Sequence, residues 1–208
     1  MKDSARRTPQ PGRRLIGPSV GGLFRHQLAG PGRSVKDAFA ALRHERGVEL
    51  IAEHPERQLQ AARYMIDRSD GHGAWEFYQL ERDLFVVTGD FIYDAPRVER
   101  VPGEELIALH LRLSGRLQID LPDRASQLVV EGPSLLIWMQ PAGCEITEHT
   151  QPGIRDSSVT LYCKPAYLRE LIGRNGIRNW SLLDEIESAA DRIWYYMEIG
   201  RASCRERV

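Results

Sequence analysis

Histidine, cysteine and carboxylate side chains are the groups in this chain whose chemistry suits a metal ion or catalysis. His110 stands alone on its segment, without a second histidine two residues further on. Glu145, Glu148 and His149 are close in sequence. A metal ion needs several such side chains that converge on one point, and a rim of solvated charges explains these three residues equally well. We therefore predict no metal and no other cofactor.

Catalytic and phosphate-binding motifs are absent from the sequence, which has no G-x-S-x-G elbow, P-loop or G-x-G-x-x-G. Cys144 and Cys163 fit no metal-ligand spacing and are expected to be small buried residues. We therefore expect no catalytic residue and a protein that is not an enzyme. His110, Trp138 and Tyr162 are the candidate ligand-binding residues, because rings with a polar group suit a small organic ligand. The alternative for His110 is a surface or hydrogen-bonded histidine.

Short segments of alternating apolar and polar residues follow one another from Phe77, separated by Gly and Pro turns. This pattern is typical of an antiparallel β-barrel or sandwich, and we expect a single one over residues 77–163. Thr88-Gly89-Asp90 is expected to separate two short β runs within residues 83–93.

One of these segments shows the alternation clearly. It places Ala108, His110 and Arg112 on one face and Ile107, Leu109, Leu111 and Leu113 on the other. The apolar face is expected to lie in the core; the predicted core residues are Ile107, Leu109, Leu111, Leu117, Ile119 and Ile137. Leu111→Asp should then unfold the barrel, because an unpaired buried charge costs several kcal/mol.

Helical periodicity is found on both sides of the strand-rich region. Residues 34–76 are expected to hold two short helices, over 35–46 and 56–68. After a barrel domain of residues 77–173, we expect a linker of residues 174–197 with a helix over 182–197. Its apolar stripe predicts a dimerisation element with Leu182, Ile186 and Ile193 at the interface. The alternative is that the stripe packs on the chain's own barrel.

The two ends of the chain differ from its body. Residues 1–33 are rich in Arg, Gly and Pro with a net charge of +6 and are expected to be disordered. Residues 198–208 match a translated sequencing adapter, so we expect an artefactual tail and a natural gene that continues differently after Met197.

The charge of residues 34–197 and the lengths of the apolar runs limit which partners the protein is expected to bind. The whole chain has a formal charge of −1, and residues 34–197 carry −8 once the +6 head and the +1 tail are set aside. An acidic body is a poor partner for phosphates, so the folded part is not expected to bind DNA. The sequence has no secretory signal and no apolar run near the ~20 residues of a membrane span. We therefore expect a cytoplasmic protein without membrane contact.

Three segments, LIALHLRLSGRLQIDL, EGPSLLIWMQPAG and VTLYCKPAYLRELIG, carry a resemblance to a known family. Leu113-Ser114-Gly115, Gly132-Pro133 and the Pro-initiated residues 165–171 occur where the sensor domain of the arabinose-regulator (AraC) family of bacterial transcription factors has such motifs. The resemblance covers residues 104–173. It implies a mainly β fold with flanking helices, namely a cupin-like antiparallel β-barrel (jelly roll) followed by a helical linker. Residues 141–146 also resemble the cupin motif P-x-G-x-x-H, with Ile146 in place of the ligand histidine.

The resemblance implies the ligand-sensing and dimerisation portion of an AraC-type regulator. Such a protein would bind a small-molecule effector and form a homodimer, and it would contact DNA only through a helix-turn-helix domain after the linker. Two alternatives remain open. One is a stand-alone metal-free cupin enzyme, such as an isomerase, and the other is a simple carbohydrate-binding or structural barrel.

Overall fold

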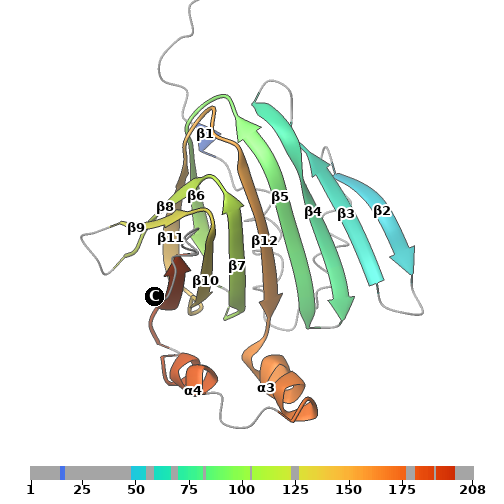
Figure 1. Ribbon diagram of the computed structural model, residues 1–208, viewed down its shortest axis with the longest axis vertical. Helices are drawn as coiled ribbons and strands as arrows, with labels where there is room; N and C mark the ends of the chain where they lie inside the picture. Colours follow the sequence, from blue (N-terminus) through green and yellow to red (C-terminus); the bar gives the residue numbers. More distant parts are fainter. Residues whose placement is uncertain are drawn as a thin grey trace, which may run out of the picture.

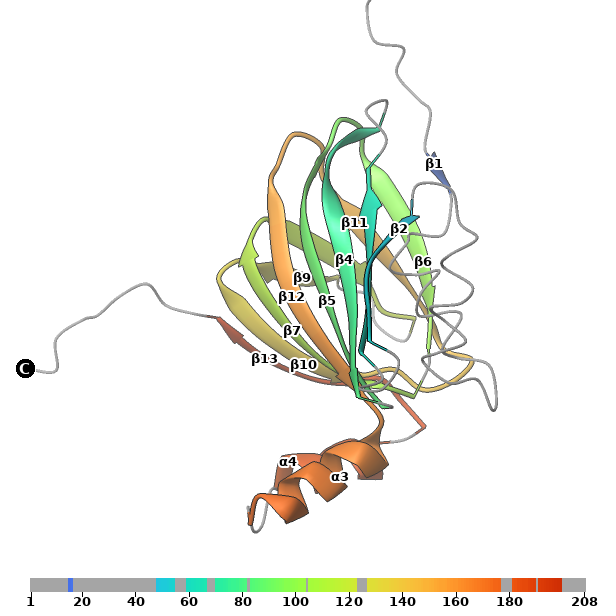
Figure 2. The ribbon, with the colours of Figure 1, turned by 90° about the vertical axis from the view of Figure 1, so that its right-hand side faces the viewer.

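Two β-sheets face each other around a common interior (Figure 1, Figure 2). The computed structural model describes residues 15–16, 48–54, 59–66, 70–81, 83–103, 105–122, 127–176, 181–189 and 191–199. The five-stranded sheet has the order β1 (Leu15–Ile16), β6 (Arg97–Pro102), β11 (Glu145–Thr150), β8 (Arg116–Asp120) and β9 (Leu128–Glu131). The eight-stranded sheet has the order β13 (Trp194–Ile199), β10 (Ser134–Met139), β7 (Ile107–Ser114), β12 (Asp156–Cys163), β5 (Leu84–Tyr93), β4 (Gly71–Glu81), β3 (Leu59–Met65) and β2 (Val48–His54).

Every strand pair is antiparallel except β1 with β6. The predicted mainly β fold with few helices is confirmed. The helices α3 (Pro165–Arg174) and α4 (Ser181–Ser188) lie at one end of the strands (Figure 2). None of the helices in the described ranges is long and apolar enough to cross a membrane.

The predicted helix over residues 56–68 is wrong, because most of this segment is strand β3. Ala62 pairs with Phe77 of β4, and both side chains are buried at 2% and 0% exposure. Pairing with β4 therefore overrides the local helical pattern. The expected helix over residues 35–46 lies outside the described residues, as does the head of residues 1–33 apart from β1.

The apolar row of β7 faces away from the barrel interior, contrary to the prediction. Leu111 and Leu113 are 42% and 50% exposed, and Ala108 on the opposite side of the strand is buried in the main core. Leu111 is therefore not a core residue, and the expectation that Leu111→Asp unfolds the barrel is wrong. Leu117 and Ile119 lie in the interior as predicted.

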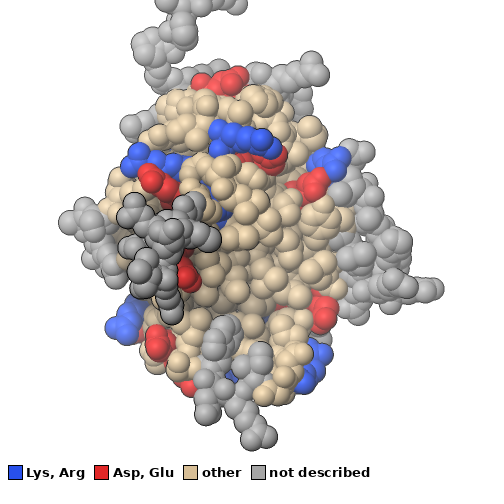
Figure 3. Space-filling model, viewed as in Figure 1, with Lys and Arg blue, Asp and Glu red and all other residues tan. Residues whose placement is uncertain are grey.

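The remaining predicted core residues of this sheet belong to a second cluster on its outer face. Ile107 and Ile137 are buried there against α3 and α4, and Leu109 is partly buried at its edge. Figure 3 looks onto this outer face, where charged side chains gather around the margins of a broad uncharged area. Among the described residues, helices thus cover the outer apolar row at one end of the strands.

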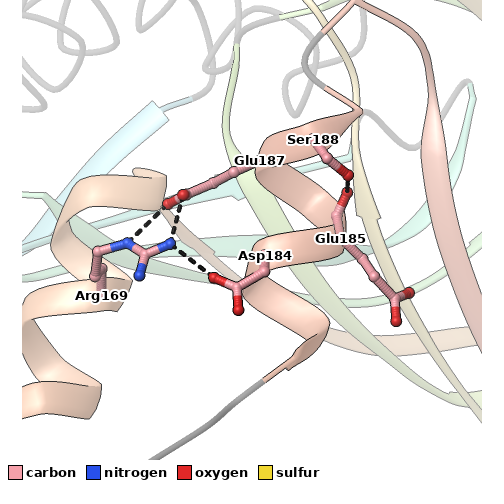
Figure 4. Close-up of polar contacts among 5 residues, drawn as sticks. All are labelled: Arg169, Asp184, Glu185, Glu187 and Ser188. Atoms are coloured by element: carbon pink, nitrogen blue, oxygen red, sulfur yellow. Dashed lines mark hydrogen bonds and ion pairs between the residues drawn. The ribbon is translucent and has the colours of Figure 1, made fainter.

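The two helices are joined by an exposed set of ion pairs. Arg169 of α3 donates hydrogen bonds to Asp184 and Glu187 of α4, with 3.2 Å to Asp184 Oδ1 (Figure 4). At the other side of α3, the Tyr167 hydroxyl donates to Glu81 Oε2 at 2.8 Å. These contacts hold α3 between α4 and the end of β4.

The predicted helix over residues 182–197 is wrong beyond its first two turns. Its second half is strand β13, which pairs with β10. The paired positions run from Ser134 opposite Ile199 to Met139 opposite Trp194. A run of aromatic residues favours a strand, and β10 offers an edge for it. The predicted stripe is split, since Ile186 is fully buried in the outer cluster and Ile193 packs on the main core. Ile186 and Ile193 thus pack within the chain itself, as the alternative prediction expected. The homodimer stays a prediction.

Candidate functional site

Polar residues form a row on the inward faces of three neighbouring strands. The register of β10, β7 and β12 sets Ser134, Arg112 and Ser158 side by side. None of the three is more than 3% exposed. One step along the strands, His110 and Thr160 form the next pair. Positions that a packed core would fill with apolar side chains therefore carry polar groups that face the space between the sheets.

The three predicted ligand-binding residues line one cavity. His110 Nδ1 lies 2.7 Å from Thr160 Oγ1. Trp138 and Tyr162 flank Ala108 in the adjoining row, and each is 6% exposed. His110 thus faces the interior, so a surface position is wrong, whereas the hydrogen-bonded histidine of the same alternative agrees with its contact to Thr160.

Arg112 and Asp156 form an ion pair in the cavity wall, and each side chain is only 4% exposed. Arg112 Nη1 donates to Asp156 Oδ2. Burial raises the pKa of Asp156, the positive charge of Arg112 offsets part of the rise, and Glu148 adds to it. Arg112 Nε and Asp156 Oδ1 are buried without a hydrogen-bond partner in the described part of the chain. A buried polar atom left in this way costs about 1–3 kcal/mol, so a molecule that satisfies both atoms gains affinity.

Two glutamates face each other in register on the opposite wall. Glu148 of β11 pairs with Glu99 of β6, one step along from the buried pair of Ile146 and Val101. Glu99 also forms an ion pair with Arg97. Like charges directly opposite each other on adjacent strands are destabilising. The ion pair with Arg97 offsets this repulsion at Glu99.

Aromatic rings close the side of the cavity next to β5. A Cβ at Gly89 would lie 2.8 Å from Trp75 Cζ3 and 3.0 Å from Phe91 Cε1. Trp75 and Phe91 have ring centroids 4.6 Å apart. Glycine is therefore needed at position 89 for the indole to lie across the strand. The predicted break at Thr88-Gly89-Asp90 is wrong, because β5 continues through it.

The cavity has a volume of about 60 Å³. Its walls combine the polar row, the aromatic rings and three carboxylates, those of Glu99, Glu148 and Asp156. Pockets for drug-sized ligands have about 300–1,000 Å³. The space between the sheets therefore suits a molecule or group of only a few non-hydrogen atoms.

Glu145, Glu148 and His149 do not come together as a site. Glu148 lines the cavity, while Glu145 is 55% exposed and His149 Nε2 lies 2.7 Å from Asp120 Oδ2 at the surface. Ile146, at the position of the cupin ligand histidine, is buried at 1% exposure. Among the described residues, no three His, Cys, Asp or Glu side chains are arranged to hold a metal ion.

The two cysteines differ in environment. Cys144 is partly exposed and Cys163 is buried. Burial raises the pKa of the Cys163 thiol to about 12. A thiol in this state is a poor nucleophile and a poor metal ligand at neutral pH.

Arg112, Asp156, Glu148 and Trp75 are site residues that the sequence did not predict. For the first three a signal was present, because each stands two residues from another polar residue of its own strand, in β7, β12 and β11 respectively. Alternation separates two faces of a strand without saying which one is inside, and the polar face of β7 was assigned to the surface.

The chain matches no protein-family model and no curated protein. Similar solved structures include KdgF from Halomonas sp., at 11% identity and a TM-score of 0.34, over 48% of this chain and 90% of that one. The cupin domain of Schizosaccharomyces pombe Cnp3 has 14% identity and a TM-score of 0.31, over 64% and 78%. At such scores the similarity carries no argument of its own, and the barrel rests on the strand order and register given above.

A variant of Bacillus subtilis oxalate decarboxylase is also similar, at 10% identity and a TM-score of 0.34, over 69% of this chain and 43% of that one. The similar structures thus include an enzyme, which contradicts the prediction that the chain is not one, but at this TM-score they show no activity for this chain. Missing hydrolase and phosphate motifs exclude only the classes of enzyme that use them.

Proposed function

We propose that the cavity binds a small polar organic molecule and that the chain is the ligand-sensing portion of an AraC-type transcriptional regulator. One observation carries the binding function. A buried polar row with an ion pair, in which two atoms have no partner among the described residues, faces a cavity walled by aromatic rings. Convergent polar groups in an otherwise apolar pocket are typical of small-molecule sites.

The regulator assignment is supported by the turn residues and the Pro-initiated helix that resemble the sensor domain. The strand that ends at Cys163 leads directly into α3, which begins at Pro165. A small-molecule effector, a homodimer and DNA contact through a following helix-turn-helix domain belong to this proposal. Since Ile186 lies inside the chain's own outer cluster, the dimer would use a surface other than the one first predicted.

Tryptophan fluorescence tests the binding function, because Trp75 and Trp138 line the cavity. Polar metabolites of a few non-hydrogen atoms are titrated into the purified chain, and the melting temperature is followed in parallel. We expect at least one compound to shift both signals in the unchanged chain and neither in His110→Ala. His149→Ala is the matched control, because that histidine does not line the cavity, and it should retain the response. A set in which no compound shifts either signal contradicts the binding function.

The regulator assignment has a test of its own. An intact copy of the gene should encode two helix-turn-helix motifs after residue 197, and its product should bind DNA with an affinity that the bound effector changes. An intact gene without such motifs removes the assignment and leaves the binding function in place.

A cupin enzyme is the second candidate, because His110 and the buried Asp156 share one cavity with a raised pKa on the acid. Nuclear magnetic resonance of a bound compound over hours separates the two candidates. Turnover that His110→Ala abolishes supports the enzyme, and an unchanged compound supports the sensor.

A further inference from the structure

The register of the strands divides the cavity wall into layers. Arg112 and Ser158 stand side by side in one layer, where the inward side chains are polar. Two layers away along β7, Ala108 lies between the aromatic residues Trp138 and Tyr162. The cavity therefore has a polar end and an aromatic end, and the polar end decides which polar group of a ligand is bound.

An incompletely satisfied ion pair lies at the polar end. Arg112 Nη1 donates to Asp156 Oδ2, whereas Arg112 Nε and Asp156 Oδ1 have no hydrogen-bond partner among the described residues. Both residues line the cavity, and each side chain is only 4% exposed, so bulk solvent does not satisfy these two atoms. The guanidinium Nε needs an acceptor, and the carboxylate Oδ1 needs a donor.

A charged ligand group satisfies only one of these two atoms. A carboxylate has lone pairs but no hydrogen to donate, and an ammonium group has three donors but no lone pair. Either group would also lie beside a like charge, the carboxylate beside Asp156 and the ammonium group beside Arg112. A buried polar atom that stays unsatisfied lowers the affinity. The group that satisfies both atoms is therefore uncharged, and it both donates and accepts.

On the basis of the proposed binding function, we propose that the polar end of the cavity binds the primary carboxamide group of a small uncharged compound. The amide oxygen accepts from Arg112 Nε, and the amide nitrogen donates to Asp156 Oδ1. A hydroxyl oxygen would have to reach both atoms at once, whereas the donor and the acceptor of an amide lie on two separate atoms. The flat amide also packs closely against the indole of Trp75, which lines the cavity where it lies across Gly89. A cavity of about 60 Å³ limits the compound to a few non-hydrogen atoms.

Compounds that share an ethyl group and differ in the polar group test the inference. Propionamide donates and accepts, butan-2-one and propionate only accept, and the propylammonium ion only donates. Propan-1-ol adds a single hydroxyl. Each compound is titrated at constant ionic strength and neutral pH, and the nuclear magnetic resonance signals of the tryptophan indole N–H groups report binding. We expect propionamide to bind at least tenfold more tightly than the ketone, the anion and the cation, since each of these leaves a buried atom unsatisfied, and more tightly than propan-1-ol.

Arg112→Lys and Arg155→Lys are a matched pair of variants. Both replace an arginine that is paired with an aspartate, but Arg155 is 66% exposed and does not line the cavity. Arg112→Lys keeps a positive charge beside Asp156 and removes the Nε donor. We expect it to weaken propionamide about tenfold, and Arg155→Lys to change nothing. Circular dichroism shows whether each variant is folded, and the compound series uses the unchanged chain.

Several results overturn the inference. They are a propionamide that does not bind, equal or tighter binding of any other compound in the series, and a folded Arg112→Lys that binds propionamide unchanged. In those cases, binding of another compound that His110→Ala abolishes leaves the proposed function standing. A broad set of polar compounds in which nothing binds overturns both.

Discussion

Leu111 and Leu136 provide a direct test of which face of the eight-stranded sheet is inside. They lie on the neighbouring strands β7 and β10 and have the same side chain. Leu136 is 2% exposed and belongs to the main core, whereas Leu111 is 42% exposed on the outer face. Replacing each with alanine removes the same atoms from two different environments.

The expected costs follow from burial. Leu→Ala at a fully buried position lowers the free energy of unfolding by about 2–5 kcal/mol. Full burial of a leucine side chain contributes about 1.5–3 kcal/mol, so Leu111, which keeps 42% of its surface in solvent, should lose only about 1 kcal/mol. We expect Leu136→Ala to melt several degrees below Leu111→Ala, because each kcal/mol shifts the midpoint by about 2–4 °C in a chain of this size.

Urea unfolding measured by far-ultraviolet circular dichroism gives both free energies, provided that the slope with urea is the same for the two variants. Leu111→Asp should remain folded in the same assay. A larger loss for Leu111→Ala than for Leu136→Ala would show that the apolar row of β7 is inside, and the site built on the opposite row would then be wrong.

Three further variants or treatments test other parts of the structure. Gly89→Ala should displace the Trp75 ring, since its Cβ would lie 2.8 Å from Trp75 Cζ3; we expect a shifted tryptophan emission spectrum, and an unchanged spectrum contradicts the packing. Asp156→Asn leaves Arg112 buried without its ion-pair partner and should cost about 3–5 kcal/mol in urea unfolding, whereas a loss below about 1 kcal/mol would show that the pair is not buried. Since the pKa of Cys163 is about 12, iodoacetamide at pH 8 should label this thiol only after unfolding, as peptide mapping can show.

The positions of the barrel strands could be predicted from the sequence because two short-range signals agree there. Alternating residues mark each strand, and Gly or Pro residues mark the turns between them. The segments around Leu117–Ile119 and Trp138 were placed correctly by these signals. The predicted helix start at residue 182 lies one residue from the start of α4 at Ser181.

The local sequence pattern predicted the wrong element where the same residues suit either a helix or a strand. Residues 59–65 and 194–199 both have helical spacing of apolar residues, and both are strands. Their partners, β4 and β10, are separate segments of the chain. Hydrogen bonds to these partner strands decide the conformation, and a short stretch of sequence does not contain the partner strand.

The sequence by itself determined that β7 has one apolar and one polar face, and that His110, Trp138 and Tyr162 stand in three separate strands, whereas the sheet order that makes these strands neighbours came from the tertiary structure. Only the tertiary structure decided which face is inside. Because side chains alternate with a period of two, either face of a strand satisfies the same pattern. The choice was made by the helices α3 and α4, which cover one end of the apolar face, and by the opposite sheet, which places Glu148 near Asp156 across the cavity.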